Sequence, residues 1–367
     1  MAVPPARRVS AASARAHTRK QKQRNSIFSP GLIRKILAVL LVGLAAWFYQ
    51  SIQPPAPKIC GTLNGPPVTS PRIKLKDGRH LAYLESGVPK EKAKYQIVFI
   101  HGLDCTKSNV FPFSLEVLEE LGVHVLSFDR PGYGESDPNL HQTVKSIALD
   151  VEELADQLKL GPKFHVIGFS LGGQLVWSCL KYIPHRLAGA AIIAPIANYW
   201  WHNLPANLSK ETFAQQPPRD QWALRVAHYA PWLTYWWNTQ KWFPASSVLA
   251  HRSDHLDAKD KEILLSVGNR YSEQVRQQGD FASVHQDLII SYQKWEFDPM
   301  DLRNPFPANE GSVHLWHGAR DIIAPVALTR YFAEQLPWIY YHELPDAGHL
   351  FPLADDMSDA ILKALLA

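Results

Sequence analysis

Between residues 95 and 194 the chain alternates short apolar runs with amphipathic stretches. Short apolar runs are typical of strands buried in a parallel sheet, and apolar residues spaced three and four apart are typical of helices. This alternation predicts an α/β fold whose mostly parallel, twisted sheet is covered by helices on both faces. The predicted strands are 95–100, 123–128, 164–168 and 187–194, and the predicted helices are 113–121, 144–158 and 171–182.

The same architecture extends to both sides of this region. Residues 72–82 form a predicted pair of strands around Asp77-Gly78, a dipeptide typical of hairpin turns. The alternation resumes near the carboxyl end, with predicted strands at 312–316 and 338–343 and predicted helices at 325–335 and 358–366. We therefore expect one core in two parts, residues 71–196 and 312–367.

Residues 197–311 interrupt the alternation and predict an inserted helical cap. This insertion holds eight of the twelve tryptophans of the chain. Large aromatic side chains could form the cap's own core. They could also cover a roomy apolar pocket or face a membrane.

The amino-terminal region predicts a membrane anchor. Residues 1–30 are basic, contain no acidic residue and have the composition of a disordered leader. The apolar run 36–52 follows, at the short end of what spans a bilayer, so residues 31–53 predict a single transmembrane helix and 54–70 a linker. A cleaved signal peptide and a plastid transit peptide fit less well. We expect a single-pass protein of the endoplasmic reticulum or another endomembrane, with a plastid membrane as the alternative.

Charge is distributed unevenly along the chain. Nine basic residues precede residue 36 and the first acidic residue is Asp77, which leaves 29 basic against 34 acidic residues for the rest. A body of this net charge repels phosphates, so we expect no nucleic-acid partner. The basic flank favours a cytosolic amino terminus and a lumenal body. The sequon at Asn207 is compatible with a lumenal body, but a tripeptide of this kind also arises by chance. The sequence does not indicate an oligomeric state.

A candidate nucleophile follows the predicted strand 164–168. The segment Gly168-Phe169-Ser170-Leu171-Gly172 matches the G-x-S-x-G elbow, which turns a strand directly into a helix and exposes the serine hydroxyl. A serine needs a base, and that base an orienting acid. His349 follows the last predicted strand and Asp321 follows the strand before it, in the chain order that this fold requires. Asp346 is the rival acid, but it lies on the same loop as His349.

Two backbone amides are expected to form the oxyanion hole. One belongs to Leu171, directly after the nucleophile, and the other to Leu103, in the loop after the strand 95–100. Asp104 and Phe169 are candidates for lining the pocket, although Asp104 could instead cap Lys107 and its neighbours. His101 is expected to brace the loop.

Taken together, these motifs resemble those of the α/β-hydrolase fold superfamily from about residue 71 to the end. The signatures are His101-Gly102, the Asp129-to-Asp137 turn, the Ser170 elbow, and the Asp321 and His349 loops. The sequence, including residues 177–189 and 305–316, is also similar to a plant group of membrane-anchored α/β-hydrolases, which implies a lipase-like or esterase-like enzyme. The resemblance implies that the Asp129 turn is scaffold. Relatives that cleave epoxides or carbon–halogen bonds have Asp where this chain has Ser170, so we exclude both activities.

The predicted function is that of a serine hydrolase acting on an ester or lipid with a bulky apolar group. It requires no metal or organic cofactor. Acyl transfer and carbon–carbon bond hydrolysis use the same three side chains and stay open as alternatives. A ligand-sensing or non-catalytic protein of the same fold is the alternative from another class.

Overall fold

The computed structural model describes residues 1–2, 30–250, 256–267 and 273–367. It divides into two units, residues 1–53 and 54–367. Most of the predicted disordered leader lies outside the described residues.

The first unit contains the helix α2 (Pro30–Ser51), none of whose side chains is buried. Its 22 residues have a length of roughly 33 Å, against a hydrocarbon core of about 30 Å. The helix is therefore long and apolar enough to cross a membrane. By itself this criterion does not separate an anchor from a signal sequence.

The second unit is built on an eight-stranded sheet, which confirms the predicted fold class. Its strand order is β1-β2-β4-β3-β5-β6-β7-β8. The pairs β1–β2 and β2–β4 are antiparallel, and all others are parallel. The strands are β1 (Arg72–Lys74), β2 (His80–Gly87), β3 (Tyr95–Ile100), β4 (Val123–Phe128), β5 (Phe164–Phe169), β6 (Leu187–Ile193), β7 (Val313–Gly318) and β8 (Ile339–Leu344).

Helices cover both faces of this sheet. Val98 and Ile100 of β3 belong to the hydrophobic core on the face of α4, α5 and α11, whereas Ile97 and Phe99 belong to the core on the face of α3 and α12. This alternation follows from the two-residue period of a strand. The helices are α3 (Leu115–Leu121), α4 (Val144–Gln157), α5 (Leu171–Tyr182), α11 (Val326–Gln335) and α12 (Met357–Leu366), with the short 3₁₀ turns η1 (Pro184–Arg186) and η6 (Phe351–Leu353).

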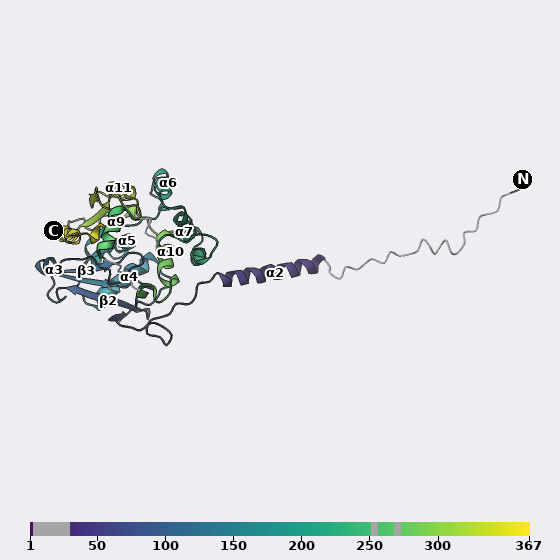
Figure 1. Ribbon diagram of the computed structural model, residues 1–367, viewed down its shortest axis with the longest axis horizontal. Helices are drawn as coiled ribbons and strands as arrows, with labels where there is room; N and C mark the ends of the chain where they lie inside the picture. The colour runs from purple at the N-terminus through teal and green to yellow at the C-terminus, as the bar shows by residue number, and fades with distance from the viewer. Residues whose placement is uncertain (3–29, 251–255, 268–272) are drawn as a thin grey trace. The chain divides into compact units, whose positions relative to one another are not determined.

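Residues 197–311 contain helices and no strand within the described ranges. Figure 1 shows α6, α7 and α10 gathered on the side of the second unit away from α3. The helices are α6 (Ala206–Ala214), α7 (Pro218–Tyr229), α8 (Thr234–Thr239), α9 (Ala258–Val267) and α10 (Gln286–Tyr292), with the shorter segments η2 (Pro231–Leu233), η3 (Glu273–Arg276), η4 (Phe281–His285, a π-helical turn) and η5 (Pro299–Asp301).

Some tryptophans of this cap are buried against the core and others are exposed. Trp201 and Trp295 are buried, with ring centroids 5.1 Å apart, and Trp201 also packs on Phe332 of α11. They join the cap to the core. Trp222 and Trp242 are instead exposed, as is Trp232.

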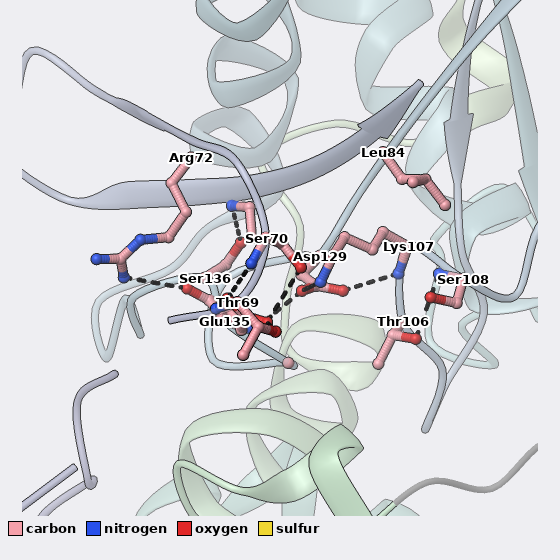
Figure 2. A network of polar contacts seen from close by, with 12 residues as sticks. Thr69, Ser70, Arg72, Leu84, Thr106, Lys107, Ser108, Asp129, Glu135 and Ser136 are labelled. Carbon is pink, nitrogen blue, oxygen red and sulfur yellow. Dashed lines mark hydrogen bonds and ion pairs between the residues drawn. The ribbon is translucent and has the colours of Figure 1, made fainter. Parts of the chain in front are cut away.

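The segment 54–70, predicted as a linker, is bound to the body. Glu135 accepts hydrogen bonds from the backbone amides and hydroxyls of Thr69 and Ser70. Beside it, the buried Asp129 pairs with Lys107 at 2.7 Å (Figure 2). The Asp129 turn therefore holds the incoming chain, in keeping with the scaffold role that the resemblance implies.

Candidate active site

Ser170 lies between β5 and α5 in a strained backbone conformation, with φ 56° and ψ −116°. Positive φ is unfavourable for a residue with a side chain and is typical of functional turns. The turn is held by a hydrogen bond from the Ser170 amide to the Ile193 carbonyl, 2.8 Å long. It also needs Gly172, because a side chain there would collide with the carbonyl oxygen of Ile100. The structure thus forms the predicted elbow.

Ser170, His349 and Asp321 form a hydrogen-bonded chain. The Oγ of Ser170 lies 2.9 Å from Nε2 of His349, and Nδ1 of His349 lies 2.6 Å from Oδ2 of Asp321. Asp321 follows β7 and His349 follows β8, so all three residues lie at the carboxyl ends of parallel strands. The rival acid Asp346 is exposed and makes neither of these contacts.

Asp321 and His349 shift each other's pKa. Burial by itself would raise the pKa of Asp321, but the His349 and His317 side chains outweigh burial and hold it well below its ordinary value. Burial by itself would lower the pKa of His349, but the charge and hydrogen bond of Asp321 raise it above its ordinary value of 6.5. These contacts therefore stabilise the protonated ring of His349. A general base takes this form after it has accepted a proton.

The predicted oxyanion amides flank this serine. Leu171 is the first residue of α5, and its amide makes no hydrogen bond to another described residue. The amide of Leu103 also has no acceptor in the described part of the chain. The loop before Leu103 lies against the elbow, because a side chain at Gly102 would approach Ser170 within 3.3 Å. Both amides can therefore donate to a bound group.

The loop is fixed by a buried arginine. Arg130 donates to the carbonyl oxygens of His101 and Gly102, and its amide donates to Nε2 of His101. Burial and the charge of Arg130 hold the pKa of His101 well below its ordinary value, which suits a neutral acceptor. His101 thus braces the loop, as predicted. Asp287 on α10 binds Arg130 through both carboxylate oxygens and also accepts from Tyr133.

Of the two roles predicted for Asp104, the capping of Lys107 is wrong. Asp104 does not cap Lys107, whose amide and ammonium group both bind Asp129. The carboxylate of Asp104 instead forms a two-point ion pair with Arg276 of the cap, at 2.6 and 2.7 Å. The physical reason is the geometry of the guanidinium group, which matches a carboxylate at two points. Phe169 is half-buried, with its ring centroid 5.2 Å from that of His349.

Three residues near the site were not predicted from the sequence. His317 of β7 lies 3.1 Å from Asp321 and 2.9 Å from the Ala324 carbonyl. Asp260 of α9 accepts the backbone amides of His349 and Leu350, and Arg276 pairs with Asp104 as above. The position of His317 at a strand end, four residues before Asp321, was a usable signal. Asp260 and Arg276 had none, because their partners are distant in the sequence.

A sequence model described as the alpha/beta hydrolase family matches residues 97–364, nearly three quarters of the chain. The chain belongs to the alpha/beta hydrolase family. This stretch includes every residue predicted for the site.

Solved structures share this architecture at low sequence identity. A thermophilic esterase from Thermogutta terrifontis is 20% identical, with a TM-score of 0.51 over 82% of this chain and 98% of that one. An enol-lactonase from Burkholderia xenovorans is 19% identical, with a TM-score of 0.54 over 81% and 98%. At this identity the likeness concerns the fold alone.

Curated relatives match the chain over a shorter region. The sn-1-specific diacylglycerol lipase ABHD11 of Danio rerio is 33% identical over 97 residues, 26% of this chain and 30% of that protein. The dihydrolipoyllysine-residue acetyltransferase component of the acetoin cleaving system of Cupriavidus necator is 29% identical over 121 residues, 33% and 30%. The chain spans less than half the length of the curated relatives it matches.

A polar cavity of about 220 Å³ lies away from the Ser170 site of this hydrolase. Its charged lining groups already have partners, since Lys107 binds Asp129 and Glu135 binds Thr69 and Ser70. We assign it no ligand. Within the described ranges, no group of three His, Cys, Asp or Glu residues is arranged to hold a metal ion. The cavity is lined by Thr106, Lys107, Ser108, Asn109, Gly134, Glu135, Gln274 and Gln277.

Proposed function

We propose that the protein is a serine hydrolase that cleaves carboxylic esters through an acyl-enzyme. The observation that supports this is the hydrogen-bonded chain from Ser170 through His349 to Asp321 at a strained elbow. Each member is in the position that its role requires: a nucleophile in reach of a base, and a base in reach of an acid.

In the first half-reaction, Oγ of Ser170 attacks the ester carbonyl while Nε2 of His349 takes the hydroxyl proton. The amides of Leu103 and Leu171 stabilise the negative charge on the carbonyl oxygen. Asp321 stabilises the imidazolium. The tetrahedral intermediate then collapses, the carbon–oxygen bond to the alcohol breaks, and His349 gives its proton to the leaving alcohol.

In the second half-reaction, a water molecule takes the place of the alcohol. His349 removes a proton from this water as it attacks the acyl carbonyl, and the same two amides hold the oxyanion. Collapse of the second intermediate returns the proton to Oγ of Ser170 and releases the carboxylic acid. An alcohol or thiol in place of water would give acyl transfer, and the assay below distinguishes the two.

We propose an apolar acyl or alcohol group for the substrate. The side chain of Leu103 packs against the hydrophobic core and against a smaller cluster of Tyr133, Val275 and Val284. Phe169 places an aromatic ring beside His349. These surroundings favour a substrate that replaces water next to the serine, such as a lipid or another hydrophobic ester.

For the first unit we propose a membrane anchor. The helix α2 has the length and hydropathy of a single span, with Arg34 and Lys35 near its start and Trp47 and Tyr49 near its end. This arrangement is typical of a helix anchored at both membrane surfaces. We propose an endomembrane location, with a plastid membrane as the alternative.

The test of the hydrolase function uses the full chain in detergent, labelled with a fluorophosphonate and assayed with p-nitrophenyl butyrate and p-nitrophenyl palmitate. Wild-type protein should be labelled and turn over, with a preference for the longer ester if the pocket is large. Ser170→Ala should abolish labelling and His349→Ala should reduce it at least 10³-fold. His141→Ala is the matched control, because His141 is an exposed histidine that contacts none of these three side chains, and it should change neither labelling nor turnover. Labelling without turnover would favour a ligand sensor, and loss of label into an added alcohol would favour acyl transfer.

A further inference from the structure

The helix α9 belongs to the cap, yet it contacts the loop that carries His349. The carboxylate of Asp260 accepts the backbone amide of His349 at 2.9 Å and that of Leu350 at 2.7 Å. Asp260 is fully buried. A charged group in this position needs compensation, which the two amides supply.

The chain around His349 is shaped to receive this carboxylate. A side chain at position 348 would collide with the carboxylate of Asp260, so the residue there is Gly348. The approach is therefore closer than ordinary packing between a cap helix and a loop. Asp260 and His349 are 89 residues apart in the sequence.

The residue directly before this helix contacts the loop that carries Asp321. Asp257, next to the start of α9, pairs with Arg320 at 3.2 Å. Arg320 directly precedes Asp321, and its amide donates to the Ala347 carbonyl on the His349 loop. The first turn of α9 and the residue before it thus contact the loop of His349 and the loop of Asp321.

We propose that Asp260 is a positioning residue that the cap supplies to the base: it fixes the His349 loop, supports the imidazolium, and makes the active site complete only when α9 is packed on that loop. The inference rests on the proposed hydrolase function and deepens it. It makes the cap part of the proton-transfer apparatus in addition to covering the substrate.

The electrostatic part follows from the charges around the ring. His349 faces Asp321 from the loop after β7 and Asp260 from α9, while Ser170 lies at its Nε2 and His317 contacts Asp321. Asp321 has the larger effect on the pKa of His349, and Asp260 raises it further. The Asp257–Arg320 pair contributes charges of both signs nearby. Removing the Asp260 charge therefore makes His349 easier to deprotonate and its cation less stable.

The test compares Asp260→Asn with Glu262→Gln in the full chain. Glu262 lies on the same helix and is exposed, so the second variant removes the same charge without touching the loop. We expect Asp260→Asn to lower kcat about tenfold or more with little change in KM, since Asp260 does not face the substrate. Its acid limb of kcat/KM should move to lower pH by about half a unit or more. Glu262→Gln should change neither quantity. An acid limb and kcat equal to those of Glu262→Gln would overturn the proposal.

A second measurement does not depend on turnover. NMR of ¹³C-histidine-labelled Ser170→Ala protein follows the titration of His349. The His349 signal is assigned as the one that disappears when His349→Ala is added to this background. Asp260→Asn should lower its pKa, and hydrogen exchange should become faster in the peptide that contains His349 and Leu350. An unchanged titration and unchanged exchange would refute the role of Asp260 even if the protein is an active esterase. If these effects occur but no ester is cleaved, the positioning role stands and the proposed function fails.

Discussion

At the scale of single residues, the decisive feature is that His349 lies next to the buried carboxylate of Asp321. A base must be neutral to accept the serine proton, so activity is lost as His349 protonates at low pH. Because the pKa of His349 is raised above 6.5, the acid limb of the wild-type kcat/KM profile should have its midpoint above pH 6.5. A midpoint below pH 6 would show that another group controls the rate.

Replacing the acid tests the assignment of Asp321 over Asp346. Asp321→Asn removes the charge that stabilises the imidazolium and allows the wrong ring tautomer, so kcat should fall by about 10⁴-fold. Asp346→Asn is the matched control on an exposed residue of the His349 loop, and its kcat should stay within about twofold of wild type. Steady-state kinetics with p-nitrophenyl butyrate measures both. The assignment is wrong if the Asp346 variant is the inactive one.

At the scale of elements, a buried ion pair joins the cap helix α10 to the loop of His101 and Gly102. Asp287 binds the fully buried Arg130, which holds the carbonyls of His101 and Gly102. Asp287→Ala leaves a buried cation without its partner and should lower the free energy of unfolding by about 3–5 kcal/mol. The exposed Glu91→Ala is the control and should stay within about 0.5 kcal/mol. Urea unfolding followed by tryptophan fluorescence measures both, and equal midpoints would contradict this role.

The elements also show what could be predicted from sequence and what could not. β3 and β4 have the predicted bounds, and α5 does too, because buried parallel strands are continuous apolar runs and the elbow fixes the start of α5. The order of Ser170, Asp321 and His349 along the strands was accessible for the same reason. The partners of Asp104 and His349 in the cap were not. Ion pairs and amide contacts across 172 and 89 residues depend on how the cap packs, and no local pattern encodes that.

At the scale of the whole molecule, the excess of basic residues before residue 36 predicts an orientation across a membrane. Lys and Arg tend to stay on the cytosolic side of a span, so if α2 is an anchor we expect residues 54–367 to lie in the lumen. The sequon Asn207-Leu208-Ser209 lies on α6 with Asn207 exposed, so a lumenal body would present this side chain for glycosylation. A carbonate wash tests whether α2 anchors the protein in a membrane, and glycosylation tests its orientation.

We expect the full chain, expressed in eukaryotic cells, to stay with membranes after an alkaline carbonate wash and to carry one glycan at Asn207. Endoglycosidase treatment should increase its electrophoretic mobility, and Asn207→Gln should remove that shift without changing the carbonate result. A variant with a sequon engineered before residue 30 is the reciprocal control and should stay unmodified there. Glycosylation at the engineered site with none at Asn207 would show the opposite orientation, because each sequon is modified only on the lumenal side. Release of the wild type by carbonate would instead contradict the anchor, since a spanning helix is not extracted by high pH.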